Sequence, residues 1–388
     1  MLETLFLLLP VAALSGWWFG RRNKSRYQIE TTPNLPTSYL KGLNYLLNEQ
    51  QDKAIDLFIQ LLDVDKDTVE THLALGSLFR RRGEVDRAIR IHQNLIARPT
   101  LNKEQRAQAL FELGQDYMRA GLLDRAETLL GELIDNEPHT VAALQHLLDI
   151  YQQEKDWDKA IQVATRLEAR TGQNQRDLIA QYYCEKAEYT YRHGEPSRAL
   201  KLLKRALAED HNCARASMME GEIEKSAGNY KAAIRAYLRV EQQEPDYLPE
   251  IIQSLTDCYR ALGKLNEMVT FLRQNLAKHN GISMMLALAA LIQQEKGEEQ
   301  AAEFISDYLK QKPSVRGMDR LIELNLQNVK DKVRDKLQVL KDVTTQLIAD
   351  KPIYTCSQCG FTGRTLYWQC PSCKHWNTVR PIQGVEGE

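Results

Sequence analysis

Four cysteines near the end of the chain are the residues best suited to chemistry. They form two Cys-x-x-Cys pairs with ten residues between them: Cys356, Cys359, Cys370 and Cys373. Two such pairs can direct four thiolates at one metal ion, and Gly360 permits the tight turn after the first pair. The spacing therefore predicts a tetrahedral four-cysteine site that either zinc or iron can fill.

The segment that carries these cysteines, residues 351–388, is too short to fold on an apolar core alone. We therefore expect the metal to hold the segment together. Aromatic side chains are expected to pack around the site and against the last helices: Tyr354, Phe361, Tyr367, Trp368 and Trp376. Thiolate ligands also imply a reducing compartment.

The remaining cysteines and a group of tyrosines lie in the helical part of the chain. Cys184, Cys213 and Cys258 occur singly and are interpreted as small apolar residues of the core. A tyrosine cluster that packs within one helical hairpin is predicted from four residues: Tyr182, Tyr183, Tyr189 and Tyr191.

The cysteine pattern resembles the rubredoxins, in which Cys-x-x-Cys-Gly is followed by Cys-Pro-x-Cys. That resemblance implies iron bound by the same four cysteines. The interval between the pairs is shorter here, and Lys374 stands where rubredoxins usually have Gly. A membrane-bound electron carrier or redox sensor is accordingly kept as the alternative function. A third function, RNA binding, rests only on a small patch that we interpret as solvated surface: Arg364, Lys374, His375 and Arg380.

A repeat organises the rest of the chain. A small residue is followed twelve positions later by Ala in six places: Gly42 and Ala54, Gly76 and Ala88, Gly114 and Ala126, Ala187 and Ala199, Gly221 and Ala233, and Ala290 and Ala302. The interval from Ala54 to Ala88, and again from Ala199 to Ala233, is 34 residues, the length of a tetratricopeptide unit. In one repeat the tetratricopeptide signature is matched by Leu113, Gly114, Tyr117, Ala126, Leu133 and Pro138.

Each unit is predicted to be a helical hairpin. Gly83, Gly121, Gly194 and Gly228 recur at the turn, where a glycine can adopt positive φ and end the first helix, and the polar residue after it is expected to cap the second. The predicted fold is an all-α tetratricopeptide-repeat superhelical solenoid of eight to nine hairpins over residues 37–350, with a degenerate last pair at about 315–350. Such solenoids bind proteins on a long concave surface.

Composition limits the function classes. Gly and Pro are sparse, at 20 and 12 residues, and strong helix formers fill long stretches. Lys and Arg total 51 against 52 Asp and Glu, so the net charge of -1 gives no general attraction to nucleic acid. No His-Glu-x-x-His, phosphate-loop or Gly-x-Ser-x-Gly motif occurs, and we expect no enzymatic activity.

The first residues predict a membrane anchor. Residues 5–20 are apolar, and Arg21, Arg22, Lys24 and Arg26 follow at once. A secretory signal would carry its charges before the apolar run. The expected arrangement is one transmembrane span at 1–20 and a basic flank and linker at 21–36, with the N-terminus outside and the bulk in the cytoplasm. The alternative is a buried helix that caps the solenoid.

Taken together, these parts resemble the lipopolysaccharide assembly protein B family of Gram-negative bacteria. The resemblance covers the whole chain and includes Met1-Leu-Glu3, Gly20-Arg-Arg22, residues 82–93, and Leu366-Tyr-Trp368 before the second cysteine pair. It implies a single-pass inner-membrane protein with a periplasmic N-terminus. It also implies an adaptor that presents the lipid A pathway deacetylase to the membrane protease FtsH and answers to an inner-membrane lipopolysaccharide-sensing protein. Whether the chain forms a homo-oligomer, and which groove residues bind partners, stays open.

Overall fold

The structure is a computed structural model. It describes residues 41–57 in part, and then 69–135, 139–279, 281–326, 331–349, 351–385 and 387. The chain divides into two compact units, Met1–Ala143 and Leu144–Glu388, which are considered separately. The predicted anchor and linker, residues 1–36, lie outside the described residues, as does Pro138. In the part of the chain that is described, every helix is too short or too polar to span a membrane.

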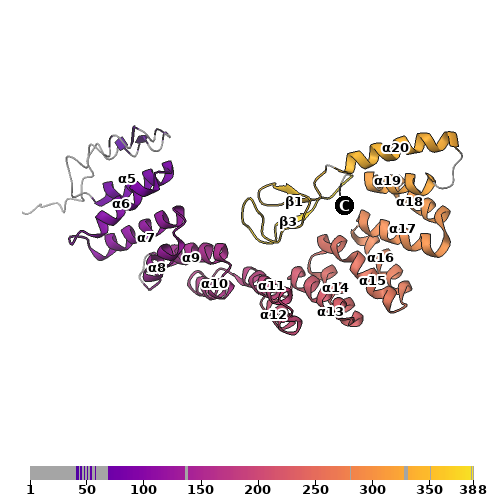
Figure 1. Ribbon diagram of the computed structural model, residues 1–388, viewed down its shortest axis with the longest axis horizontal. Coiled ribbons are helices and arrows are strands. Elements are labelled where there is room, and N and C mark those ends of the chain that lie inside the picture. The colour runs from indigo at the N-terminus through magenta and orange to yellow at the C-terminus, as the bar shows by residue number, and fades with distance from the viewer. Residues whose placement is uncertain are drawn as a thin grey trace, which may run out of the picture. The chain divides into compact units, whose positions relative to one another are not determined.

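The first unit is built from helical hairpins. In each of them two consecutive helices pack together, α5 with α6 and α7 with α8, and α6 packs on α7 to join the pairs (Figure 1). Their bounds are α5 Val69–Arg82, α6 Val85–Ile96, α7 Lys103–Arg119 and α8 Leu123–Leu133. The next helix, α9, spans Thr140–Glu154.

The second unit continues the same pattern. Its helices are α10 Trp157–Thr171, α11 Arg176–Arg192, α12 Pro196–Glu209, α13 Ala214–Ser226, α14 Tyr230–Gln243, η1 Pro245–Tyr247, α15 Leu248–Ala261, α16 Leu265–His279, α17 Ile282–Lys296, α18 Glu298–Gln311, α19 Val315–Leu326 and α20 Asp331–Ala349. Among the first helices of these hairpins, α11 contacts α13, α13 contacts α15, and α15 contacts α17, so they line one common face. The expected degenerate last pair is present as α19 and α20.

The turns confirm one part of the hairpin prediction and correct another. Gly83, Gly121, Gly194 and Gly228 have φ between 75° and 86°, as expected. The residues after them, however, make no side-chain cap hydrogen bond to the second helix. A backbone bond stabilises the turn instead, for example from Glu84 N to Phe79 O at 2.8 Å, which is the long bond of a Schellman motif.

Small residues let the paired helices approach closely. Ala88, Ala126, Ala199 and Ala233 are fully buried. At Gly221 an added Cβ would lie 2.5 Å from the Tyr237 ring, so only a residue without a side chain fits there. The repeat spacing is therefore a packing requirement, because the large residue of one helix fills the space left by the small residue of the other.

A small antiparallel sheet follows the last helix. Its strands are β1 Tyr354–Cys356, β2 Thr362–Gly363 and β3 Val379–Pro381, in the order β2-β1-β3. Tyr354 pairs with Gly363 on one side and with Pro381 on the other. We call the segment from Pro352 to Val385 the cysteine module. Its few buried apolar side chains surround Cys356 and Cys370, and these residues form its core.

Candidate metal centre

The fold brings the four predicted ligands together. The Sγ atoms of Cys356, Cys359, Cys370 and Cys373 all lie within 4.8 Å of one another. Sγ of Cys356 is 3.8 Å from that of Cys373, and Sγ of Cys359 is 3.7 Å from that of Cys370. Four sulfurs placed about 2.3 Å from a central zinc define a tetrahedron with edges of about 3.8 Å. The site can therefore hold one metal ion of zinc or iron size.

The electrostatics of the site also fit a cation. Burial by itself raises the pKa of Cys356, but the Thr378 hydroxyl and the backbone N–H groups of Cys359 and Gln358 outweigh it and lower that pKa to about 6. At Cys373 a backbone N–H lowers the pKa, but burial and the neighbouring sulfurs raise it to about 12. Four thiolates this close repel one another, and a cation between them removes the repulsion.

Backbone geometry sets the two cysteine turns. Gly360 has φ of 74°, as expected, and its N–H donates to Cys356 O at 3.0 Å. Lys374 occupies the matching place after the second pair with φ of 62°, and its N–H donates to Cys370 O at 2.9 Å. Lysine thus adopts the left-handed conformation that glycine adopts more readily, at a cost of roughly 1–2 kcal/mol.

The cysteine module packs through Trp376 on the face of the second unit that the first helices of the hairpins line. We call this the first-helix face. Its indole N–H donates to Gln152 Oε1 at 2.9 Å, and the Gln369 amide donates to the same oxygen at 3.2 Å. The Trp376 ring meets Trp157 and Tyr182 edge-on, with centroids 6.1 and 5.9 Å away. Gln152 of α9, Trp157 of α10 and Tyr182 of α11 therefore surround the Trp376 ring. We call these three residues, together with Arg215 of α13, the socket.

Arg215 of α13 lies beneath both tryptophans of the cysteine module. Its side chain is 2% exposed, and its guanidinium carbon lies 5.6 Å from the Trp368 ring centroid and 6.0 Å from that of Trp376. The guanidinium donates to Glu185 at 2.8 Å and to Glu188 at 2.9 Å. Burial lowers the pKa of Arg215, but nearby Cys184, Glu185 and Glu188 outweigh it and raise the pKa. The contact is thus a desolvated cation–π arrangement with paired charges.

A second anchor of the cysteine module is formed by η1. The Tyr247 hydroxyl, which is buried, lies 3.0 Å from Val379 O and 3.1 Å from Asn377 Oδ1. Arg380 donates to Asp246 at 2.9 Å. On α15, which follows η1 directly, Glu250 accepts a hydrogen bond of 2.7 Å from the Tyr354 hydroxyl of β1. Strand β3 is therefore held by η1, and strand β1 by α15.

These contacts correct two expectations. The module aromatics Trp368 and Trp376 pack against α10, α11, α13 and η1 rather than the last helices, because the chain turns back from α20 across the array. The predicted tyrosine cluster divides, since Tyr182 is buried in the socket while Tyr189 is 65% exposed against His193. The basic patch is solvated, as interpreted: Arg364, Lys374 and His375 are exposed, and Arg380 keeps 41% of its side chain exposed while it pairs with Asp246.

The socket residues Arg215 and Gln152 were missed by the sequence interpretation. The only local signal was a charged residue between two alanines at Ala214-Arg215-Ala216, where a small residue would suit the helix contact. Cys184 and Cys213 are buried and in contact, with sulfurs 3.8 Å apart, and Cys258 is buried, so their interpretation as core residues is confirmed.

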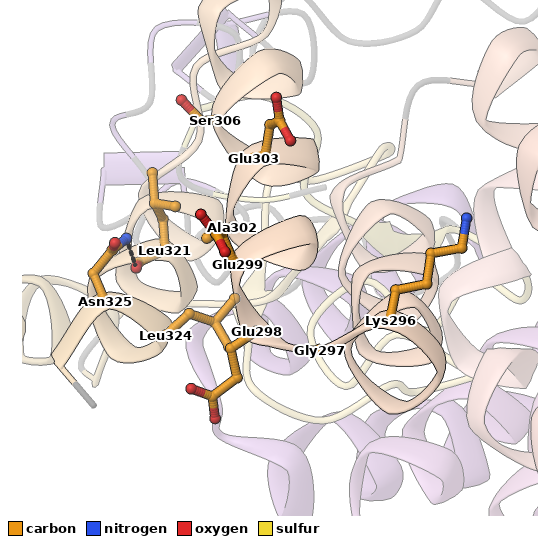
Figure 2. A pocket seen from close by; sticks show the side chains of 10 residues that line it. All are labelled: Lys296, Gly297, Glu298, Glu299, Ala302, Glu303, Ser306, Leu321, Leu324 and Asn325. Carbon is orange, nitrogen blue, oxygen red and sulfur yellow. Dashed lines mark hydrogen bonds between the residues drawn. The ribbon is translucent and has the colours of Figure 1, made fainter. Parts of the chain in front are cut away.

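An open hollow between α18 and α19 is a large depression of this unit away from the cysteines. It measures about 880 Å³, and Glu298, Glu299 and Glu303 line it together with Leu321 and Leu324 (Figure 2). Acidic side chains around an open depression are ordinary solvated surface. Within the described ranges, the four cysteines are the one group of His, Cys, Asp or Glu side chains arranged to hold a metal.

The fold and the site define a tetratricopeptide-repeat protein that carries a rubredoxin-type metal-binding domain at its C-terminal end. Family comparisons agree: residues 354–381 match the rubredoxin metal binding domain, and residues 71–107, 111–174 and 184–247 match tetratricopeptide repeats. A crystal structure of the MamA protein aligns with 45% of this chain and 92% of its own at 21% identity, with a TM-score of 0.30.

Two full-length relatives give the family. Lipopolysaccharide assembly protein B of Escherichia coli K12 is 43% identical over 388 residues, and its counterpart from Haemophilus influenzae is 36% identical over 398 residues, each match covering both chains completely. The chain belongs to the lipopolysaccharide assembly protein B family.

Proposed function

We propose that this protein is a membrane-tethered cytoplasmic adaptor that regulates lipopolysaccharide synthesis. In this proposal it presents the deacetylase of the lipid A pathway to the membrane protease FtsH, under the control of an inner-membrane lipopolysaccharide-sensing protein. The observation that carries the proposal is full-length similarity at 43% identity to a lipopolysaccharide assembly protein. The tetratricopeptide-repeat fold supports it, because such arrays provide extended surfaces for binding other proteins.

The second part of the proposal concerns the metal. Cys356, Cys359, Cys370 and Cys373 bind one zinc or iron ion, and the ion holds the cysteine module in the shape that fits the Arg215 socket. The support is the tetrahedral spacing of the sulfurs and the docking of both tryptophans beside them. The metal then acts indirectly. By keeping the cysteine module folded on the first-helix face, it determines which residues of that face are accessible to a partner.

Deleting residues 1–20 is expected to stop regulated turnover of the deacetylase while the helical units stay folded. Confining an adaptor and its protease to one membrane raises their effective concentration by about 10²–10⁴. We expect the half-life of the deacetylase in cells to lengthen to that of cells lacking the adaptor, as measured by pulse-chase labelling, with helical circular dichroism unchanged.

The matched control for this deletion replaces residues 1–20 with an unrelated single-span anchor of the same orientation. Recovery of turnover would show that tethering alone is required. Normal turnover by the anchorless chain at native expression levels would contradict the proposed mechanism.

One observation favours the alternative function, an electron carrier or redox sensor. Cys359 is exposed, so an iron ion in the site would lie within reach of a redox partner. In that case the chain purified from its native host should contain about one iron ion and show the visible absorption of a ferric tetrathiolate, bleached reversibly by one electron. A colourless chain with one zinc ion would rule this function out, because zinc has no redox chemistry.

A further inference from the structure

The last helix of the array, α20, exposes an apolar stripe. Five large apolar residues on it are each between 48% and 62% exposed: Val333, Val339, Leu340, Val343 and Leu347. We call them the α20 stripe. Terminal units of a repeat array usually carry a polar outer face, because no further unit covers them. The α20 stripe is apolar where a capping face should be polar, which marks it as an interaction surface.

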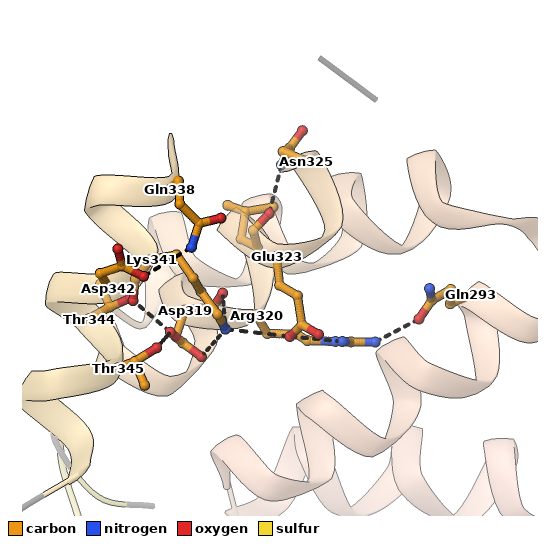
Figure 3. A network of polar contacts seen from close by, with 11 residues as sticks. Gln293, Asp319, Arg320, Glu323, Asn325, Gln338, Lys341, Asp342, Thr344 and Thr345 are labelled. Atoms are coloured by element: carbon orange, nitrogen blue, oxygen red, sulfur yellow. Dashed lines mark hydrogen bonds and ion pairs between the residues drawn. The ribbon is translucent and has the colours of Figure 1, made fainter. Parts of the chain in front are cut away.

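The orientation of the stripe is fixed by a polar network on the neighbouring helix. Asp319 of α19 accepts hydrogen bonds from Lys341 at 2.6 Å, Thr344 at 2.8 Å and Thr345 at 3.1 Å (Figure 3). Burial raises the pKa of Asp319, but these hydrogen bonds outweigh it and lower the pKa. Because Thr344 is 4% exposed, the stripe cannot turn inward without breaking this network.

The spacing of the stripe suits helix pairing. Val333, Leu340 and Leu347 are seven residues apart, and Val343 follows Leu340 by three, which is the apolar repeat of a coiled-coil seam. The face of α20 that carries Arg334, Asp335 and Asp342 has charges of both signs. A helix that lies on an anionic membrane surface is instead rich in Lys and Arg on its polar face. The pattern therefore favours a helix as the occupant over a bilayer.

We propose that the α20 stripe pairs antiparallel with the α20 stripe of a second copy of this chain. A twofold axis between Leu340 and Val343 places Leu340 of one copy against Val343 of the other, and the reverse. The two stripes then face each other with apolar residues in contact. Lys336 is an exposed cation within the seam. Antiparallel pairing keeps the two copies of Lys336 at opposite ends, whereas parallel pairing would set them side by side.

The expected dimer is weak. One pair of helices buries less than the roughly 1,200–2,000 Å² of a stable interface, so association in the micromolar range is expected. Confinement of both copies to one membrane would raise their local concentration. This proposal concerns the assembly of the adaptor, and it stands or falls independently of which partners the repeats bind.

The test is sedimentation equilibrium of the full chain in detergent across the micromolar range. Wild type and the Gln338→Lys variant, which adds the same charge on the side of α20 away from the stripe, should both dimerise. Leu340→Lys should associate at least about 100-fold more weakly, because its ammonium would be buried without a partner. Leu347→Lys serves as a second variant, and circular dichroism reports whether α20 stays helical.

Mixing charge-swapped chains distinguishes self-pairing from an indirect effect. Leu340→Lys chains mixed with Val343→Asp chains should form a heterodimer, since the two substituted positions face each other across the proposed axis. A wild-type chain that is monomeric throughout would overturn the proposal and leave the stripe to a helix of another protein. Equal dimerisation of wild type and Leu340→Lys, or no heterodimer in the mixture, would also overturn it.

Discussion

Removing the metal with a strong chelator is expected to unfold the cysteine module while the helical hairpins remain. The module has a three-stranded sheet of eight residues in total and a core of only a few side chains, so its own burial cannot hold it folded. Structural zinc contributes roughly 10–16 kcal/mol in comparable small sites. Hydrogen exchange at Ser357, Cys370 and Asn377, whose N–H groups bond across the module, should accelerate by about 10³-fold or more.

Two variants sharpen this test. Cys356→Ser should reproduce the effect of the chelator and reduce bound metal from about one ion to none, as measured by elemental analysis. Cys258→Ala removes a buried cysteine of α15 that lies outside the sulfur cluster, so metal content and module protection should stay unchanged. Slow exchange in the metal-free module would contradict a structural role for the ion. Restoration of slow exchange by added zinc would support it.

Replacing Arg215 with Ala is expected to release the module from its socket and to lower the stability of the second unit by about 3 kcal/mol. The substitution removes two cation–π contacts and leaves Glu185 and Glu188 without their shared partner. Both carboxylates keep some solvent access, at 27% and 35%, which limits the cost. Urea unfolding followed by circular dichroism gives the stability change, and tryptophan fluorescence follows the exposure of Trp368 and Trp376.

The control for this substitution is Arg235→Ala on α14, an exposed arginine that should change stability by less than about 0.5 kcal/mol. Arg215→Lys keeps the charge but loses the planar group that stacks on the tryptophans, so an intermediate loss is expected. If Arg215→Ala and Arg235→Ala unfold at the same urea concentration, the socket does not hold the module.

The hairpins could be predicted because their determinants are local. Gly83 and Gly121 each end a helix through their own backbone conformation, and the twelve-residue interval from Gly221 to Ala233 spans a single hairpin. The same holds for the cysteine pairs, since each Cys-x-x-Cys turn is built by its own backbone. The side-chain caps expected after these glycines were wrong, because the Schellman bonds already satisfy the turn.

The position of the module could not be predicted, because its contacts join residues far apart in the sequence. Gln152 and Trp376 are 224 positions apart, and Tyr247 and Val379 are 132 apart. Nothing near Trp376 indicates which helix it will meet. The expectation that the aromatic residues would pack on the last helices followed sequence proximity, and it was wrong for that reason.

The sequence by itself determined the helical repeat, the four sulfur ligands that can bind a metal, and the family. Each rests on residues within one turn or one repeat, or on similarity along the whole chain. Only the tertiary structure decided that the cysteine module returns to the face formed by α11, α13 and α15, and that α20 keeps an apolar stripe uncovered. Those outcomes depend on how successive hairpins stack. The small rotation between neighbouring hairpins adds up over many units, so the sequence of one hairpin does not specify it.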